Sequence, residues 1–182
     1  LTAGNGSYTP VFLSELPRLF RKKVVPLDVV FIHVSPPDNH GYCSLGVSVE
    51  ATVAAIESAK TVIAQVNPNM PRTFGDGILH VSEIDFLVDV DCPIHEKEEE
   101  AITPLEAKIG AHIASLIDDK STLQLGIGSI PNAALANLMN HKDLGLHTEM
   151  FSDGVIDLIL KDVINCNYKG VTRGRVLSTF ML

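Results

Sequence analysis

One glutamate stands where a nucleophile would be useful. Glu149 follows a short apolar run in the segment GLHTEMFSDG, residues 145–154, and a Ser-Asp-Gly turn comes directly after it. A carboxylate at the tip of a strand is usually a solvated surface group, and that interpretation stays open. The alternative is that Glu149 is partly removed from water, because a poorly solvated carboxylate can attack a carbonyl carbon. Such an attack needs a neighbouring group that stabilises the negative charge formed on the carbonyl oxygen.

The segment STLQLGIGSIPNAALANLM, residues 121–139, offers that group. It is typical of a short strand, a Gly126-Ile127-Gly128 turn and a helix that begins near Pro131. Glycines let a ligand approach the backbone N–H groups, and the start of the helix adds partial positive charge there. Such a turn suits an oxyanion or a carboxylate, although the same pattern also serves plain strand-to-helix packing. Because one helix and one loop separate the turn from Glu149, adjacent strands would bring the two together.

Other reactive side chains make weaker candidates. Cys92 and His95 have a metal-like separation, but no second pair of ligands follows them. His40 and Cys43 suggest a thiol–imidazole pair without the third group that would orient it, so a turn histidine is the better interpretation. His147 shares a strand face with Glu149 and either positions a substrate or packs. The glycine turn is no Walker loop, and it lacks the third glycine of a dinucleotide fingerprint, so a nucleotide-binding domain is a weak alternative.

The elements that must position these groups follow an α/β pattern. Short β-branched runs alternate with segments of helical period, which predicts open sheets with flanking helices. The strand candidates are residues 28–34, 61–66, 84–90, 123–125, 146–150 and 176–180. A helix over residues 49–60 makes the first two strands a strand-helix-strand unit. Both strands run into proline-rich loops, which are either walls of a ligand site or simple turns.

An acidic stretch marks the predicted domain boundary. CPIHEKEEEAIT spans residues 92–103, and a helix start with a Thr-x-x-Glu capping box, Thr103 to Glu106, follows it. We expect Leu105, Ile109, Ile113 and Leu116 to form the buried stripe of this helix. The predicted organisation is the C-terminal part of a first α/β domain in residues 1–92, an acidic linker in residues 93–103 and the N-terminal part of a second, catalytic α/β domain in residues 104–182.

Composition excludes several classes of partner. The net charge is -8, and the only compact basic run lies at residues 18–23, so binding to nucleic acid is not expected. No apolar run reaches the ~18 residues of a membrane span. The three cysteines are widely separated, which favours reduced thiols in the cytoplasm, or in the mitochondrial matrix of a eukaryote, over a disulfide framework.

Several longer motifs carry a family resemblance. SPPDNHGYCSLGVSVEAT, AQVNPNMPRTFGD, LQLGIGSIPNAAL and GLHTEMFSDGVIDL occur in this order, and the likeness runs from TPVFLSELP at Thr9 onward. Together they resemble the acetyl-CoA hydrolase/transferase family, particularly its 4-hydroxybutyrate and butyrate/acetate CoA-transferases. The resemblance implies a two-domain enzyme with CoA-transferase-like (NagB/RpiA-like) sheets, of which this chain is expected to be a middle fragment.

The resemblance also implies roles for particular residues. Glu149 would be the nucleophile that becomes a glutamyl-CoA thioester, Gly126, Ile127 and Gly128 would donate backbone N–H groups to the oxyanion, and Gln124 would line the pocket. Coenzyme A would be a co-substrate, and no metal or tightly bound cofactor is expected. A further glycine-rich region beyond Leu182 would help to bind coenzyme A and complete the oxyanion hole.

The implied activity is transfer of CoA between an acyl-CoA and a short-chain carboxylate by a homo-oligomer, a dimer or higher. An acyl-CoA hydrolase that uses the same intermediate is the first alternative, and an inactive fragment with a binding or assembly role is the second.

Overall fold

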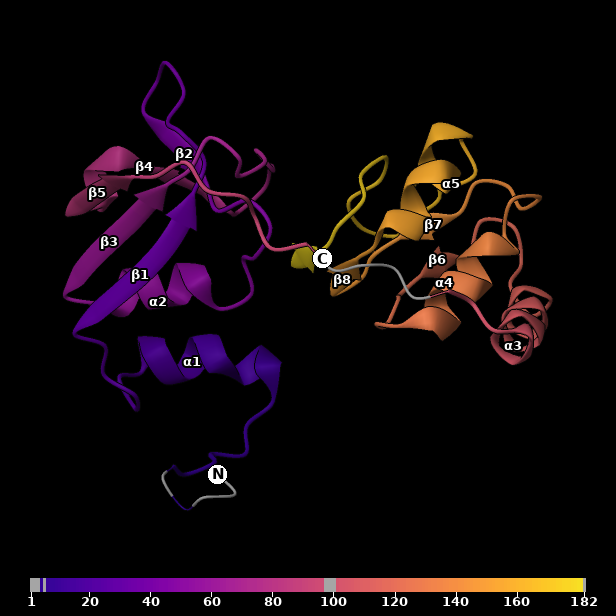
Figure 1. Cartoon of the computed structure of the whole chain (residues 1–182), viewed down its shortest axis with the longest axis horizontal. Coiled ribbons are helices and arrows are strands. Elements are labelled where there is room, and N and C mark those ends of the chain that lie inside the picture. Colours follow the sequence, from indigo (N-terminus) through magenta and orange to yellow (C-terminus); the bar gives the residue numbers. More distant parts are fainter. Residues whose placement is uncertain (1–3, 5, 97–100, 182) are drawn as a thin grey trace. The chain divides into compact units, whose positions relative to one another are not determined.

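The computed structural model describes residues 4, 6–96 and 101–181. The chain divides into two compact units, Leu1–Ile94 and His95–Leu182, here called the N-terminal and C-terminal units (Figure 1). Each unit combines short strands with helices, so the predicted α/β class is confirmed. The predicted linker over residues 93–103 extends over residues outside the described ranges, and the assignment of the units to two particular domains stays a prediction.

A parallel sheet forms the centre of the N-terminal unit. Its strands are β1 (Val29–Val34), β3 (Thr61–Val66) and β5 (Phe86–Asp89), in the order β1-β3-β5 (Figure 1). Helix α2 (Thr52–Ser58) lies between β1 and β3 in the chain, so the predicted strand-helix-strand unit is confirmed, with a helix shorter than expected. A short 3-10 turn (Leu13–Glu15) leads into α1 (Leu16–Arg21), which packs against α2.

Only one face of this sheet belongs to the hydrophobic core. Alternate residues of β1 and β3 are buried on that face, because successive side chains of a strand point to opposite sides. The buried side chains are Ile32, Val34, Val62, Ala64 and Val66. On the other face, Phe31 of β1 lies in register with Ile63 of β3, which lies in register with Phe86 of β5, and both phenylalanines are largely exposed.

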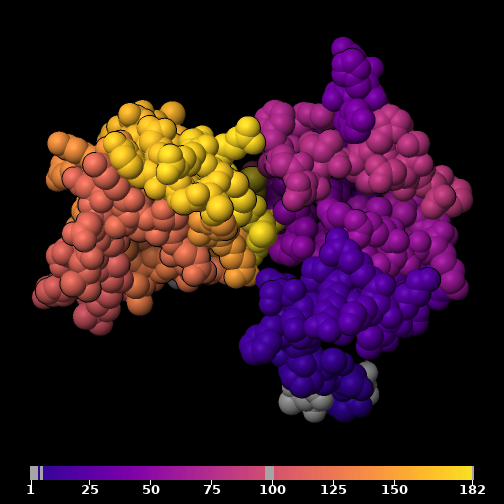
Figure 2. All heavy atoms as spheres, turned by 180° about the vertical axis from the view of Figure 1, so that it is seen from behind, coloured from indigo at the N-terminus to yellow at the C-terminus, as the bar shows by residue number. Residues whose placement is uncertain are grey.

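The loops at the carboxyl ends of β1 and β3 are fastened to each other. Strands β2 (Tyr42–Ser44) and β4 (Ile78–His80) pair antiparallel, a pair that the sequence did not predict, and a 3-10 turn (Val81–Glu83) follows β4. The Ser44 hydroxyl donates to the Thr73 carbonyl over 3.1 Å and accepts the Thr73 amide over 3.0 Å. The exposed turn between β1 and β2 projects from the surface of this unit (Figure 2).

The C-terminal unit is built from shorter elements. They are α3 (Pro104–Ala114), β6 (Thr122–Leu123), α4 (Ser129–Ala136), β7 (Gly145–Leu146), β8 (Met150–Phe151), a 3-10 turn (Asp153–Val155), α5 (Ile156–Leu160) and β9 (Phe180–Met181). Strand β6 pairs parallel with β7, and β8 pairs parallel with β9. The strand predicted over residues 146–150 is therefore split into β7 and β8, although an isolated bridge from His147 to Leu177 continues its pairing.

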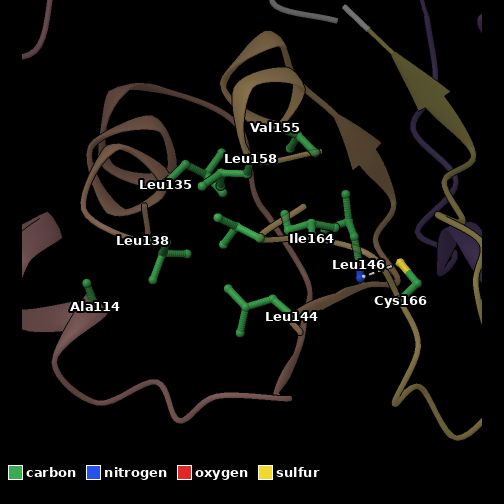
Figure 3. Packing of buried hydrophobic residues seen from close by; sticks show 10 residues of the cluster. Ala114, Leu135, Leu138, Leu144, Leu146, Val155, Leu158, Ile164 and Cys166 are labelled. Atoms are coloured by element: carbon green, nitrogen blue, oxygen red, sulfur yellow. Dashed lines mark hydrogen bonds between the residues drawn. The ribbon is translucent and has the colours of Figure 1, made fainter. Parts of the chain in front are cut away.

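A leucine-rich core holds these elements together. Its buried residues include Leu135 and Leu138 from the α4 region, Leu144 and Leu146 from β7 and the residue before it, and Leu158 from α5 (Figure 3). The Leu146 amide donates a long hydrogen bond of 3.4 Å to the Cys166 sulfur, the dashed line of Figure 3. All three cysteines are free thiols in the structure.

Helix α3 begins as predicted but buries a different stripe. The Glu106 amide donates to the Thr103 hydroxyl over 3.3 Å and the Thr103 amide donates to Glu106 over 2.8 Å, so the predicted capping box is confirmed. The predicted stripe is wrong at both ends, because Leu105 is 68% exposed and Leu116 is 85% exposed. The reason is a close approach to α4: a Cβ added to Gly110 would lie 2.5 Å from the backbone carbonyl carbon of Ala133. This contact turns the face of Gly110 and Ala114 inward.

Among the residues that the structure describes, no helix is both long enough and apolar enough to cross a membrane.

Candidate active site

The glycine turn and Glu149 follow two neighbouring strands. Strand β6 precedes the turn and β7 precedes Glu149, with Thr122 in register with Gly145 and Leu123 in register with Leu146. The His147 amide donates to the Leu123 carbonyl over 2.9 Å, which extends the ladder by one step. The carboxyl ends of parallel neighbours meet at the same edge of a sheet, so the prediction that adjacent strands bring the two segments together is confirmed.

Thr148 links the two segments beyond the end of the ladder. Its hydroxyl accepts the Leu125 amide over 2.9 Å and donates to the Leu125 carbonyl over 3.1 Å. Thr148 is only 3% exposed. Each partner is the residue directly before a predicted site residue, because Leu125 precedes Gly126 and Thr148 precedes Glu149. Thr148 was not among the predicted site residues, and its only signal in the sequence is its place between two residues that face the other way.

The backbone of Glu149 is held while its side chain is exposed. The Glu149 carbonyl accepts the amides of Thr179 and Phe180 over 3.0 and 3.1 Å and the Thr179 hydroxyl over 2.9 Å. Thr148 and Met150 are buried, so strand alternation turns Glu149 to the opposite face, which the exposed His147 shares. The expectation that the carboxylate is partly removed from water is therefore wrong for this chain by itself.

The glycine turn presents open backbone. Gly128 has φ +114° and ψ -173°, a conformation that essentially only glycine adopts, and it is the residue before α4. A Cβ added to Gly128 would have no heavy atom within 4 Å, and one added to Gly126 would meet only the Pro131 ring at 3.9 Å. Ile127 is 56% exposed, and Gln124 is exposed as well. A ligand therefore has access to the main chain of the turn.

Helix α4 begins at Ser129, two residues before the predicted start at Pro131. The amide groups of a first helical turn have no partner within the helix. The residues before Pro131 supply these donors, since proline carries no N–H. They lie directly after the turn, which is the arrangement that favours a negatively charged ligand.

Glu106 fastens the start of α4 to the start of α3. One of its carboxylate oxygens belongs to the capping box with Thr103, and the other accepts a short hydrogen bond from the Ser129 hydroxyl. These bonds, first that from Ser129 and then those from Thr103, lower the pKa of the Glu106 carboxyl. The capping role was readable from the sequence. The contact with Ser129 was not, because it joins residues 23 positions apart.

A buried lysine lies beneath the strand that leads to Glu149. Lys169 is 1% exposed, and its ammonium donates to the carbonyls of Leu146 and Arg175, each over 2.8 Å. A Cβ added to Gly145 would lie 2.6 Å from Cγ of Lys169, so glycine is needed in β7 to admit the lysine stem. Lys169 was not predicted to be buried, since a single lysine in a loop carries no pattern.

The weaker candidates do not assemble into sites. Cys92 accepts long hydrogen bonds from the side-chain amides of Gln65 and Asn67, at 3.5 and 3.4 Å, which is a packing role. Cys43 is fully buried, which raises the pKa of its thiol, whereas His40 is exposed. Within the described ranges, no group of three or more His, Cys, Asp or Glu side chains is arranged to hold a metal ion.

Comparison with known proteins identifies the family of this chain. The model of the acetyl-CoA hydrolase/transferase N-terminal domain matches residues 1–102. The chain therefore belongs to the acetyl-CoA hydrolase/transferase family.

The sequence similarity to named proteins extends over both units. The 4-hydroxybutyrate coenzyme A transferase of Clostridium kluyveri is 50% identical over 182 residues, which is 100% of this chain and 42% of that protein. The succinyl-CoA:acetate/propanoyl-CoA:succinate CoA transferase of Fasciola hepatica is 49% identical over 98% of this chain and 38% of its own length. The chain thus spans about two-fifths of the length of the curated relatives it matches.

Solved structures give the same result. The crystal structure of a 4-hydroxybutyrate CoA-transferase from Porphyromonas gingivalis matches with a TM-score of 0.91 at 45% identity, covering 96% of this chain and 44% of that chain. RipA from Yersinia pestis matches with a TM-score of 0.91 at 36% identity, covering 96% of this chain and 41% of that chain.

Proposed function

We propose that this chain belongs to a CoA-transferase that moves coenzyme A between an acyl-CoA and a short-chain carboxylate, with Glu149 as the nucleophile. The observation that carries the proposal is the β6–β7 pairing, continued by the Thr148 hydroxyl, which joins the segment before the open Gly126–Gly128 turn to the segment before Glu149. The names of the relatives, all CoA transferases, support the same reaction class.

The proposed reaction balances as two exchanges at one carboxyl group. The Glu149 carboxylate attacks the thioester carbonyl, which forms an acyl–glutamyl anhydride and releases CoA thiolate. The thiolate attacks the glutamyl carbonyl, which gives a glutamyl-CoA thioester and frees the donor carboxylate. An acceptor carboxylate then attacks this thioester, which forms an acceptor–glutamyl anhydride and releases CoA thiolate. The thiolate attacks the acceptor carbonyl of the anhydride, which gives the new acyl-CoA and regenerates the Glu149 carboxylate. No electron is gained or lost, so the sequence of steps needs no redox partner.

The turn has a specific part in these steps. Each attack places negative charge on a carbonyl oxygen, and backbone N–H groups of Gly126, Ile127 and Gly128 would donate to it, with Gln124 at the pocket wall. Removing one such donor in other enzymes costs about 100-fold to 1,000-fold in rate. The exposed Glu149 side chain needs cover from water during the reaction. We assign that cover to parts of the full-length protein that this chain does not include, together with the bound substrate.

Trapping of the intermediate tests the nucleophile. The full-length protein is incubated with acyl-CoA and then with borohydride, which reduces a glutamyl thioester to an alcohol that mass spectrometry locates in the sequence. We expect the modification at Glu149 and loss of activity in Glu149→Ala. Glu15→Gln, a change at an exposed glutamate of the N-terminal unit, is the control that should retain activity. Full activity in Glu149→Ala would refute the assignment.

Product analysis tests the reaction type. With acetate present, a transferase converts butyryl-CoA into acetyl-CoA without net loss of thioester, whereas a hydrolase consumes the thioester with or without acetate. We expect the thioester to be conserved. Loss of thioester at the same rate in both conditions would replace transfer by hydrolysis. The same comparison with succinate and 4-hydroxybutyrate as acceptors would identify the preferred carboxylate.

A further inference from the structure

We infer that Thr148 is a positioning residue, which sets the distance between the oxyanion-binding turn and the nucleophile through its hydroxyl. The inference rests on the proposed function, because it assigns Thr148 a role in the reaction of Glu149. Its starting point is that the Thr148 hydroxyl bonds to Leu125 just beyond the last backbone hydrogen bond between the β6 and β7 segments.

The β6–β7 ladder stops short of both functional residues. The last regular pair joins Leu123 and Leu146, and the last backbone bond across the pair runs from the His147 amide to the Leu123 carbonyl. Two residues further along, the Leu125 amide and carbonyl both bond to the Thr148 hydroxyl instead of to a backbone group. A single side chain thus continues the ladder to the peptide that precedes Gly126.

The hydroxyl is well suited to fix this spacing. It uses its one proton on the Leu125 carbonyl and a lone pair on the Leu125 amide, so the two bonds constrain it from both sides. Thr148 is 97% buried, which keeps water from replacing either bond. On the other edge of the same segment, the Thr148 amide donates to the Leu177 carbonyl over 3.0 Å, so the threonine backbone is held as well.

The consequence for catalysis is geometric. The hydroxyl joins the residue before the turn to the residue before Glu149, so a change in its bonds shifts donor and nucleophile relative to each other. Misplacement of reacting groups by about 1 Å is enough to lower a rate by about 100-fold. Thr148 is buried and its hydroxyl is occupied by Leu125, so we expect no contact between it and the substrate. Its removal should therefore slow the chemical step without weakening substrate binding.

Two variants separate positioning from ordinary packing. Thr148→Val keeps the size and branching of the side chain but removes the hydroxyl, and Thr148→Ser keeps the hydroxyl but removes the methyl group. Thr122→Val, in β6 of the same sheet, is the control for removing an exposed threonine hydroxyl. All variants are made in the full-length protein, and the thermal midpoint of each is measured.

The decisive measurement is the rate at which the enzyme forms glutamyl-CoA in its first turnover, with acyl-CoA in excess. The KM for acyl-CoA is measured beside it. For Thr148→Val we expect a rate that is about 10-fold to 100-fold lower and a KM for acyl-CoA within about threefold of wild type. For Thr148→Ser we expect a rate near that of wild type even if its thermal midpoint falls. A purely structural role predicts the opposite, with rates that follow the thermal midpoints of the two variants.

The outcomes also separate this inference from the proposed function. A wild-type rate in Thr148→Val, in a protein that Glu149→Ala inactivates, overturns the role of Thr148 and leaves the nucleophile intact. A loss in Thr148→Val that appears entirely as a raised KM also overturns it. Absence of the Glu149 adduct in the wild-type protein overturns the proposed function, and the role of Thr148 falls with it.

Discussion

The close approach of α3 and α4 at Gly110 allows a prediction whose sign can be worked out. In Gly110→Ala, the new Cβ would lie 2.5 Å from both the carbonyl carbon and the oxygen of Ala133 and 2.8 Å from the Ala134 nitrogen. Carbon atoms in favourable contact are about 3.5–4.0 Å apart, so the helices would have to separate by roughly 1 Å. Because all three contacts are with backbone atoms, no side chain can rotate away to relieve them.

Two opposing free energies decide the outcome. Alanine in place of glycine favours a helix interior by about 1 kcal/mol. Forcing an extra methyl group into a packed interface costs about 1–3 kcal/mol or more, and a clash with backbone belongs at the upper end. We therefore expect Gly110→Ala to lower the free energy of unfolding by about 1–2 kcal/mol despite its better helix propensity.

Thermal unfolding followed by circular dichroism measures this change. Gly170→Ala is a matched control, because a Cβ at Gly170 meets no heavy atom within 4 Å. There the lower entropy of the unfolded chain should make the change neutral or stabilising by up to about 1 kcal/mol. Gly110→Ala should thus lower the thermal midpoint, whereas Gly170→Ala should leave it unchanged or raise it. A thermal midpoint of Gly110→Ala at or above wild type would show that α3 and α4 do not approach this closely.

Two further predictions concern the buried cation and the helix cap. Lys169→Met should lower the free energy of unfolding by about 2 kcal/mol. The loss of two charge-assisted hydrogen bonds to carbonyls outweighs the gain from no longer burying an ammonium group. Urea denaturation measures this change, with Lys161→Met, at an exposed lysine, as the control. The pKa of the folded Glu106 carboxyl is lowered by its bonds to Ser129 and Thr103, so its contribution to stability is fully present above the unfolded pKa and is lost as the pH falls through the folded value. The thermal midpoint of wild type should therefore fall more steeply on acidification than that of Glu106→Gln. An equal fall of the thermal midpoint with pH in both proteins would contradict this.

Local patterns in the sequence were sufficient for the elements that depend on neighbouring residues. The Thr103–Glu106 capping box, the strand over residues 61–66 and the strand-helix-strand unit around α2 all follow from short-range chemistry and periodicity. The buried face of α3 was misjudged for a physical reason. Helical period ranks side chains by apolarity, whereas Gly110 faces inward because the backbone of α4 approaches it.

The sequence pointed to candidate site residues, whose roles stay predictions, but not to the contacts that hold their segments together. The turn and Glu149 were selected from their types and spacing, and the pairing of β6 with β7 joins their segments. The bonds of Thr148 to Leu125 and of Glu106 to Ser129 each span 23 positions. No local pattern predicts which distant group a hydroxyl or a carboxylate will bond to. The exposure of Glu149 was likewise not readable from its apolar neighbours. Adjacent residues of a strand point to the opposite face, so their burial does not show whether the Glu149 side chain is buried.

The Lys169 contacts have a dynamic consequence for the segment between α5 and β9. Residues 165–175 contain no helix or strand, and such irregular surface segments usually open readily. Here, opening of the segment would break the hydrogen bonds from the Lys169 ammonium to the Leu146 and Arg175 carbonyls and expose the side of β7 that Lys169 covers. Fluctuations of the segment are thereby tied to those of β7, the strand that leads to Glu149. The segment should exchange its protected amide hydrogens as slowly as the sheet beside it, although by secondary structure it is only a loop.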